Sequence, residues 1–159
     1  MATIIVGMAD WKVAKGSDIL TTLGLGSCVG VTFWDKAKGI GGMGHFMLPS
    51  SEGYTNQNRA KFADTCIQDL LVAITRAGAV RANLVAKIAG GAHMFSGAGA
   101  GNVLKVGERN AAVAKEILAE LKIPLLANDT GGTHGRTIEL NIGDGKLKIR
   151  TVGFGEKFV

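Results

Sequence analysis

The segment CVGVTFWDKAKGIGGMGHF, residues 28–46, is typical of a β-hairpin and decides how the rest of the chain can fold. Its two halves are rich in β-branched, aromatic and glycine residues, and the polar run between them is typical of a turn. A four-residue loop from Asp35 to Lys38 would place Cys28 opposite His45, whereas a five-residue loop would place Cys28 opposite Phe46. Directly opposed side chains have Cβ atoms about 4.5–5.5 Å apart. The first register would therefore bring a thiol within reach of an imidazole.

Short β-rich runs surround this hairpin. Residues 3–13 and 18–27 precede it, and residues 83–91, 125–129, 136–142 and 146–152 follow it. The last two runs are joined by a Gly-Asp-Gly turn, which predicts a second hairpin. The hairpin itself contributes two strands, residues 28–35 and 40–48. Together with the six other runs, the sequence predicts roughly eight strands.

Two helices are predicted where apolar residues recur at spacings of three and four. The first covers about residues 58–77 and is ended by Gly78. The second covers about residues 108–121, and Pro124 closes the segment. The predicted apolar side of the first helix is Phe62, Ala63, Cys66, Ile67, Leu70, Leu71 and Ile74, and that of the second is Ala112, Val113, Ile117, Leu118 and Leu121.

Consecutive strands with two helices predict an α+β fold, with helices packed on sheet, rather than a doubly wound nucleotide fold. The 159-residue length suits a single domain covering residues 1–159. Hydrophobic residues make up 47% of the chain and charged residues 19%, which excludes a disordered protein. The 24 glycines cluster in GIGGMG, AGGAH, SGAGAG and TGG. Such clusters predict tight turns and close backbone approaches.

The N-terminus has no basic start and reaches Asp10 before any long apolar run, so neither a secretory signal nor membrane insertion is expected. Two cysteines are too few for a disulfide framework, and we expect reduced thiols in the cytoplasm. The net charge of +5 favours acidic partners. Because the basic residues are dispersed and few aromatics accompany them, a nucleic-acid partner is not expected.

Cys28 and His45 are candidates for nucleophilic catalysis. A neighbouring imidazolium stabilises a thiolate, and the same ring can later protonate a leaving amine. Thr22 or Thr21 on the preceding strand would orient the imidazole through a hydroxyl. Ser27, together with the Cys28 backbone N–H and the open backbone at Gly26, would line an oxyanion pocket. The pattern predicts acyl transfer at a carbonyl.

A structural interpretation competes with this one, because free cysteines beside glycine and valine are commonly small core residues. Cys66 is assigned to the core on its helical spacing. His93 and His134 do not form a compact ligand cluster with a cysteine, so no metal site is predicted. The SGAGAG loop lacks the residues of a phosphate motif and is interpreted as a rim around a site.

Six segments together resemble the CheD family of chemoreceptor glutamine deamidases from end to end. They are TLGLGSCVGV, GGMGHFMLP, KFADT, AKIAGGAHMF, GERNAAVAKEIL and LLANDTGGTHGRTIELNIGDGKLKIR. The resemblance implies a cytoplasmic enzyme that hydrolyses glutamine side chains of methyl-accepting chemotaxis receptors to glutamate and releases ammonia. It assigns a Cys-His-Thr triad to Cys28, His45 and Thr22, with no cofactor and no metal.

The resemblance also implies an α-β-β sandwich similar to the catalytic domains of cytotoxic necrotizing toxins. It implies binding to the cytoplasmic helical domain of receptors, possible binding of a CheC-type phosphatase, and methylesterase activity in some members. The competing function is a non-catalytic adaptor that binds receptors or the phosphatase. Solvent access and a low pKa of Cys28 are the features expected of the enzyme.

Overall fold

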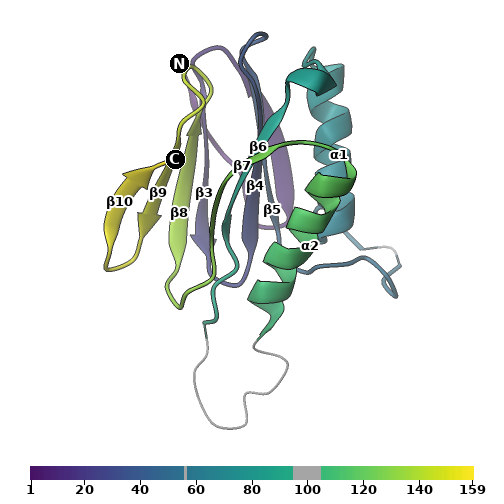
Figure 1. Cartoon of the computed structure of the whole chain (residues 1–159), viewed down its shortest axis with the longest axis vertical. Coiled ribbons are helices and arrows are strands. Elements are labelled where there is room, and N and C mark those ends of the chain that lie inside the picture. Colours follow the sequence, from purple (N-terminus) through teal and green to yellow (C-terminus); the bar gives the residue numbers. More distant parts are fainter. Residues whose placement is uncertain (56, 95–104) are drawn as a thin grey trace, which may run out of the picture.

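Two five-stranded sheets and two helices form three layers in the computed structural model, which describes residues 1–55, 57–94 and 105–159 (Figure 1). The helices are α1 (Ala63–Arg76) and α2 (Val106–Glu120). They lie on one face of a middle sheet, whose other face packs on an outer sheet. The predicted α+β class is confirmed.

The middle sheet has the strand order β2-β5-β4-β6-β7 and contains the hairpin of residues 28–46. Its strands are β2 (Asp10–Lys15), β4 (Val29–Asp35), β5 (Ile40–Phe46), β6 (Val85–Gly90) and β7 (Leu125–Thr130). All neighbours are antiparallel except β6 and β7, which are parallel.

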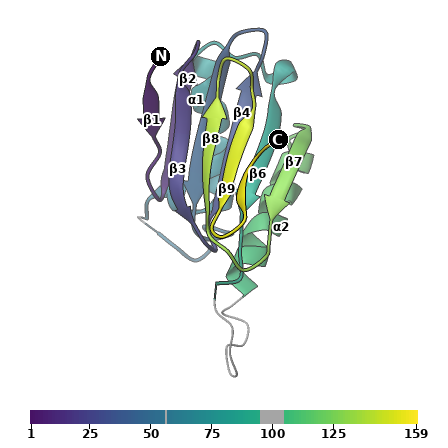
Figure 2. The ribbon, with the colours of Figure 1, turned by 90° about the vertical axis from the view of Figure 1, so that its left-hand side faces the viewer.

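The outer sheet has the strand order β1-β3-β8-β9-β10. In Figure 2 this sheet faces the viewer. Its strands are β1 (Thr3–Ile5), β3 (Ile19–Leu25), β8 (Arg136–Asn141), β9 (Leu147–Thr151) and β10 (Gly155–Phe158). Strand β1 is parallel to β3, and the others are antiparallel. The predicted hairpin of β8 and β9 is confirmed.

Two apolar cores hold the layers together. One lies between the helices and the middle sheet and includes Val31, Phe33 and Phe46 with Ile67 and Leu70 of α1. The other lies between the two sheets and includes Leu25, Cys28, Met43, Ile138 and Ile149. Cys28 therefore belongs to the layer between the sheets.

The glycines of β5 allow α1 to approach closely. A Cβ on Gly42 would lie 2.9 Å from Cδ1 of Leu70, and one on Gly44 would lie 2.8 Å from Sγ of Cys66. Larger residues at these positions would separate the helix from the sheet. The predicted close approach at GIGGMG is confirmed, as is the burial of Cys66 on the apolar side of α1.

Several predicted boundaries are wrong. The run 3–13 is two strands in different sheets, because the chain crosses between the layers at residues 6–9, where Ala9 has φ 55°. The first helix begins at Ala63 after a short 3₁₀ helix, Arg59–Lys61; a second one covers Arg81–Asn83. Strand β10 was not predicted, because all four of its residues are exposed and show no apolar alternation.

The predicted apolar side of the second helix is also wrong in part. Its buried residues are Gly107, Asn110, Ala111, Ala114 and Leu118, whereas Ala112 is exposed. The SGAGAG loop lies outside the described residues. In the described parts of the chain, no helix has the length and apolarity needed to cross a membrane.

Candidate functional site

The hairpin register differs from both predicted ones. His45 pairs with Gly30, and Val29 pairs with Phe46, so the connecting loop consists of residues 36–39. Cys28 precedes β4 by one residue and is two residues away from the partner of His45. A shift of two residues keeps the face of the sheet, and such diagonal neighbours have Cα atoms about 7–8 Å apart. Both side chains thus belong to the face turned toward the outer sheet.

The hydroxyl of Thr22 connects the outer sheet to His45 in the middle sheet. Thr22 Oγ1 lies 2.7 Å from His45 Nδ1 and donates to the carbonyl oxygen of Val6 at 2.7 Å. A threonine hydroxyl has one proton, and a carbonyl oxygen can only accept. The Thr22 oxygen must therefore accept the Nδ1–H of His45. In a neutral imidazole this tautomer leaves the lone pair on Nε2.

His45 Nε2 is buried and has no hydrogen-bond partner within the described residues. Burial lowers the pKa of His45, so the ring is neutral at pH 7. Burial also raises the pKa of the Cys28 thiol, and a hydrogen bond from its own backbone N–H acts more weakly in the opposite direction. The residues Cys28 and His45 are 8% and 1% exposed. The prediction that Cys28 is accessible to solvent and has a low pKa is therefore wrong for the protein without substrate.

The turn after β6 fixes the backbone of Cys28. The N–H of Gly91 donates to the carbonyl oxygen of Cys28 at 2.8 Å, and that of Ala92 donates to the carbonyl oxygen of Gly26 at 2.8 Å. Gly90 has φ 111°, and a Cβ there would lie 2.3 Å from the Cys28 carbonyl oxygen. Only glycine fits this position. The close approach predicted for AGGAH is thus a contact with the candidate nucleophile's backbone.

The predicted oxyanion residues lie on the bend directly before Cys28. The N–H of Gly26 donates to the carbonyl oxygen of Gly24 at 3.0 Å, so it is already occupied. In the chain as described, the backbone N–H of Ser27 has no assigned acceptor. The side chain of Met94 packs against Gly26, with its Cγ 3.0 Å from the position of a Cβ. Ser27 is consequently the better donor of the two.

Asn110 of α2 was missed in the sequence. It is fully buried, and its Nδ2 donates to the carbonyl oxygens of Ser27 at 3.0 Å and of Met47 at 2.9 Å. Asn110, Ala114 and Leu118 recur every four residues on the buried side of α2. A polar residue in that series was the available signal.

Arg136 of β8 also supports the turn beside Cys28. Its Nη1 donates to the carbonyl oxygen of Gly90 at 3.2 Å, and its Nε forms an ion pair with Asp129 at 3.1 Å. Only 8% of the residue is exposed. This guanidinium therefore fixes the glycine against which the Cys28 carbonyl packs.

The remaining candidates take structural positions. Thr21 donates to the carbonyl oxygen of Ile138 at 2.9 Å, which leaves Thr22 as the residue in contact with His45. His134 packs edge-on against Phe154, with ring centroids 4.6 Å apart. Within residues 1–55, 57–94 and 105–159, no group of three metal-ligating side chains is present.

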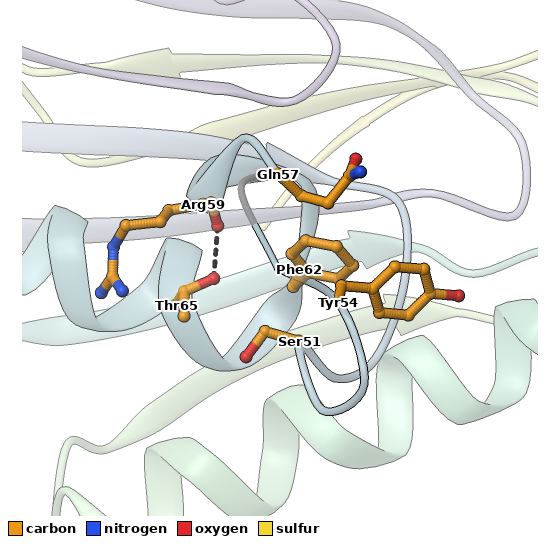
Figure 3. Close-up of a pocket in the computed structure, with 6 residues that line it drawn as sticks. All are labelled: Ser51, Tyr54, Gln57, Arg59, Phe62 and Thr65. Atoms are coloured by element: carbon orange, nitrogen blue, oxygen red, sulfur yellow. Dashed lines mark hydrogen bonds between the residues drawn. The ribbon is translucent and has the colours of Figure 1, made fainter.

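A separate cavity of about 200 Å³ is formed by the segment between β5 and α1 together with the start of α1 (Figure 3). It is lined by Ser51, Tyr54, Gln57, Arg59, Phe62 and Thr65. The rings of Tyr54 and Phe62 lie 5.0 Å apart between centroids, and the Thr65 hydroxyl donates to the Arg59 carbonyl. The lining contains no thiol or imidazole, so this cavity offers none of the chemistry of the Cys28 site.

Comparison with known proteins identifies the family. The family model described as CheD chemotactic sensory transduction matches residues 47–151. A probable chemoreceptor glutamine deamidase of Lachnoclostridium phytofermentans is 52% identical over 155 residues, covering 97% of this chain and 96% of the relative. This chain belongs to the CheD family.

Two further CheD relatives support the same assignment. The probable chemoreceptor glutamine deamidase of Moorella thermoacetica is 50% identical over 93% of this chain and 90% of its own, and that of Caldanaerobacter subterraneus is 47% identical over 97% and 96%. A Neisseria meningitidis protein of the DUF152 family has a TM-score of 0.49 and 12% identity, over 82% of this chain and 64% of its own. A likeness that distant carries no functional argument.

The CheD family model begins at Met47, after the three residues of the candidate triad. The relatives extend further, since a match over 97% of this chain leaves out too few residues to miss the segment 22–45. The similarity to the CheD family therefore extends over nearly the whole chain. The roles of Thr22, Cys28 and His45 are inferred from the positions and contacts of these residues.

Proposed function

We propose that this chain is a chemoreceptor glutamine deamidase. It would hydrolyse glutamine side chains on the cytoplasmic helical domain of methyl-accepting chemotaxis receptors to glutamate, releasing ammonia. The relatives' names support the substrate class. The observation that carries the chemistry is the hydrogen bond from His45 to Thr22, which leaves the Nε2 lone pair available on the face of the middle sheet that also carries Cys28.

The proposed reaction begins with both partners neutral. Nε2 of His45 removes the proton of the Cys28 thiol as sulfur attacks the carboxamide carbon of glutamine. The imidazolium then gives this proton to the departing nitrogen, the C–N bond breaks, and ammonia leaves a thioester on Cys28. The same ring next takes a proton from a water molecule as the water oxygen attacks the thioester carbon; the C–S bond then breaks and the ring returns this proton to the sulfur. Glutamate and the free thiol are the products.

Burial explains why generating the thiolate only with substrate present is favourable. An isolated thiolate in the layer between the sheets would lack solvation, which is why the pKa of Cys28 is raised. Proton transfer during attack avoids a buried ion pair in the free protein. The backbone N–H groups of Ser27 and Cys28 are the proposed donors to the oxyanion, and Gly26, against which Met94 packs, belongs to the bend that carries them.

The wider role follows from the same proposal. A cytoplasmic location, binding to a CheC-type phosphatase and hydrolysis of receptor methyl esters are further parts of it. The shared thioester would permit the esterase reaction. The α-β-β layering supports the proposed similarity to the catalytic domains of cytotoxic necrotizing toxins.

The test is incubation with receptor cytoplasmic fragments, measuring released ammonia and glutamine-to-glutamate mass shifts. We expect Cys28→Ala to lower the rate at least about 10³-fold, because the nucleophile is lost. Cys66→Ala is the matched control, since Cys66 is a buried cysteine on the helix side of the middle sheet. Full deamidation by Cys28→Ala would show that Cys28 is not the nucleophile. Binding of receptor fragments without release of ammonia by the unmodified protein would favour the adaptor function instead.

A further inference from the structure

We propose that Asn110 is a positioning residue that sets the separation between Cys28 and His45 from the helix layer. The inference rests on the proposed deamidase function. Asn110 reaches across to the two backbone segments that carry the candidate catalytic residues: Ser27 directly precedes Cys28, and Met47 follows His45 by two residues. One amide group therefore joins the two sides of the site.

The orientation of the Asn110 amide is fixed by its contacts. Both neighbours of the Nδ2 atom are carbonyl oxygens, at 3.0 and 2.9 Å, and these can only accept hydrogen bonds. Reversing the amide would place three oxygens together. The two N–H bonds of a single planar group are thus both used, and the directions to Ser27 and Met47 are set by one rigid geometry.

The cost of keeping Asn110 indicates a role beyond packing. Its side chain is fully buried, and its Oδ1 has no hydrogen-bond partner in the described residues. A buried acceptor left unsatisfied is destabilising, because it loses its hydrogen bonds to water on folding. Its neighbours in the series, Ala114 and Leu118, are apolar. An apolar residue at position 110 would avoid this cost but would release both carbonyls.

These contacts complete a support around Cys28. The carbonyl oxygens of Gly26, Ser27 and Cys28 accept hydrogen bonds from Ala92, Asn110 and Gly91 respectively. Among these three contacts, only that of Asn110 also extends to the strand end after His45. Loss of Asn110 should consequently alter the distance between sulfur and Nε2 while the Gly90–Gly91 turn remains in place.

The experiment compares Asn110→Ala and Asn110→Asp with Leu118→Ala. Leu118 is 1% exposed on the same buried side of α2 and belongs to the core between the helices and the middle sheet. Its truncation should lower stability while leaving the hydrogen bonds of Asn110 in place. All variants are assayed where circular dichroism shows them folded. We expect Asn110→Ala to lower kcat about 10²-fold with KM within twofold, whereas Leu118→Ala keeps kcat within about threefold.

The pH profile of Asn110→Asp separates positioning from a general loss of stability. A protonated carboxyl can donate one hydrogen bond to a carbonyl, whereas a carboxylate repels both oxygens. Activity of Asn110→Asp relative to the unmodified protein should therefore rise several-fold as pH falls from about 8 to about 6. A flat ratio across this range would contradict the proposal.

Alkylation of Cys28 by iodoacetamide tests the inference without a receptor. In the unmodified protein, replacing His45 with Gln should slow alkylation about tenfold, because the base is lost. In an Asn110→Ala background the same replacement should change the rate less than twofold. If the His45 effect is equal in both backgrounds, Asn110 does not position the pair. Absence of deamidation alone would instead overturn the proposed function and leave this readout intact.

Discussion

Replacing Thr22 with Val removes the hydroxyl that joins the two sheets at the site while almost preserving side-chain volume. Thr22 is fully buried, and its single oxygen makes two hydrogen bonds of 2.7 Å. The substitution leaves the Val6 carbonyl without its donor and the Nδ1–H of His45 without its acceptor. Each of these two unsatisfied buried groups costs about 1–3 kcal/mol, so the free energy of unfolding should fall by about 2–6 kcal/mol.

The catalytic effect of Thr22→Val has a separate cause. Without an acceptor at Nδ1, the imidazole can move its proton to Nε2, and that tautomer cannot take the Cys28 proton. We expect kcat/KM to fall about 10²-fold or more, and less than in Cys28→Ala, because the nucleophile remains. Thr22→Ser keeps the hydroxyl and is the matched control, with activity expected within about tenfold of the unmodified protein.

Urea denaturation and deamidation of receptor fragments measure the two effects. The linear dependence of unfolding free energy on urea gives the stability loss. The reasoning would be refuted if Thr22→Val were as stable and active as Thr22→Ser. It would also be refuted if both substitutions lowered activity equally, since the hydroxyl would then have no specific role.

Three further predictions follow from the structure. Gly90→Ala should abolish activity and lower the free energy of unfolding by several kcal/mol, because its Cβ would lie 2.3 Å from the Cys28 carbonyl oxygen. The deamidation assay and urea denaturation measure the two effects, and Gly131→Ala, also at positive φ but without neighbours within 4 Å, is the control. Burial raises the pKa of Cys66 from 9.0 to about 12, so the unfolded chain loses this proton first and stability falls as pH rises above 9. Urea titrations at pH 9 and 10 should show Cys66→Ala losing about 1 kcal/mol less than the unmodified protein; equal losses would contradict this. Turnover on receptor fragments should fall with added salt if the net charge of +5 assists binding to an acidic receptor, and salt-independent rates would remove that contribution.

Local patterns predicted the elements well where burial and spacing agree. All seven predicted positions of the first apolar side are buried, and six of them lie on α1, because the same spacing of three and four determines which side chains meet the sheet. Phe62 is the residue directly before the helix. The single-domain organisation of residues 1–159 stays a prediction. The catalytic roles of Cys28, His45 and Thr22 also stay predictions.

The register of the hairpin could not be predicted from its residues alone. The turn uses residues 36–39, one position later than expected, and this moves the pairing by two. Because side chains alternate between the two faces of a sheet, an error of two residues in the register keeps Cys28 and His45 on one face. The two residues therefore remain candidates although the predicted register was incorrect. Their pKa directions depend on burial between two sheets, a long-range property that no local motif contains.

Asn110 shows what a local pattern leaves out. Its partners, Ser27 and Met47, are 83 and 63 residues away in the chain. The spacing of apolar residues in the second helix also gave the wrong face in part, which concealed the polar position among buried ones. Only the packing of α2 on the middle sheet relates this residue to the Cys28 loop.

The protonation of His45 tests the central claim most directly. Nitrogen-15 NMR of imidazole-labelled protein at pH 7 distinguishes the two neutral tautomers from the charged ring. We predict a neutral His45 with its proton on Nδ1, donated to Thr22, and an unprotonated Nε2. A proton on Nε2, or a charged imidazole at pH 7, would contradict the account of how Cys28 is activated.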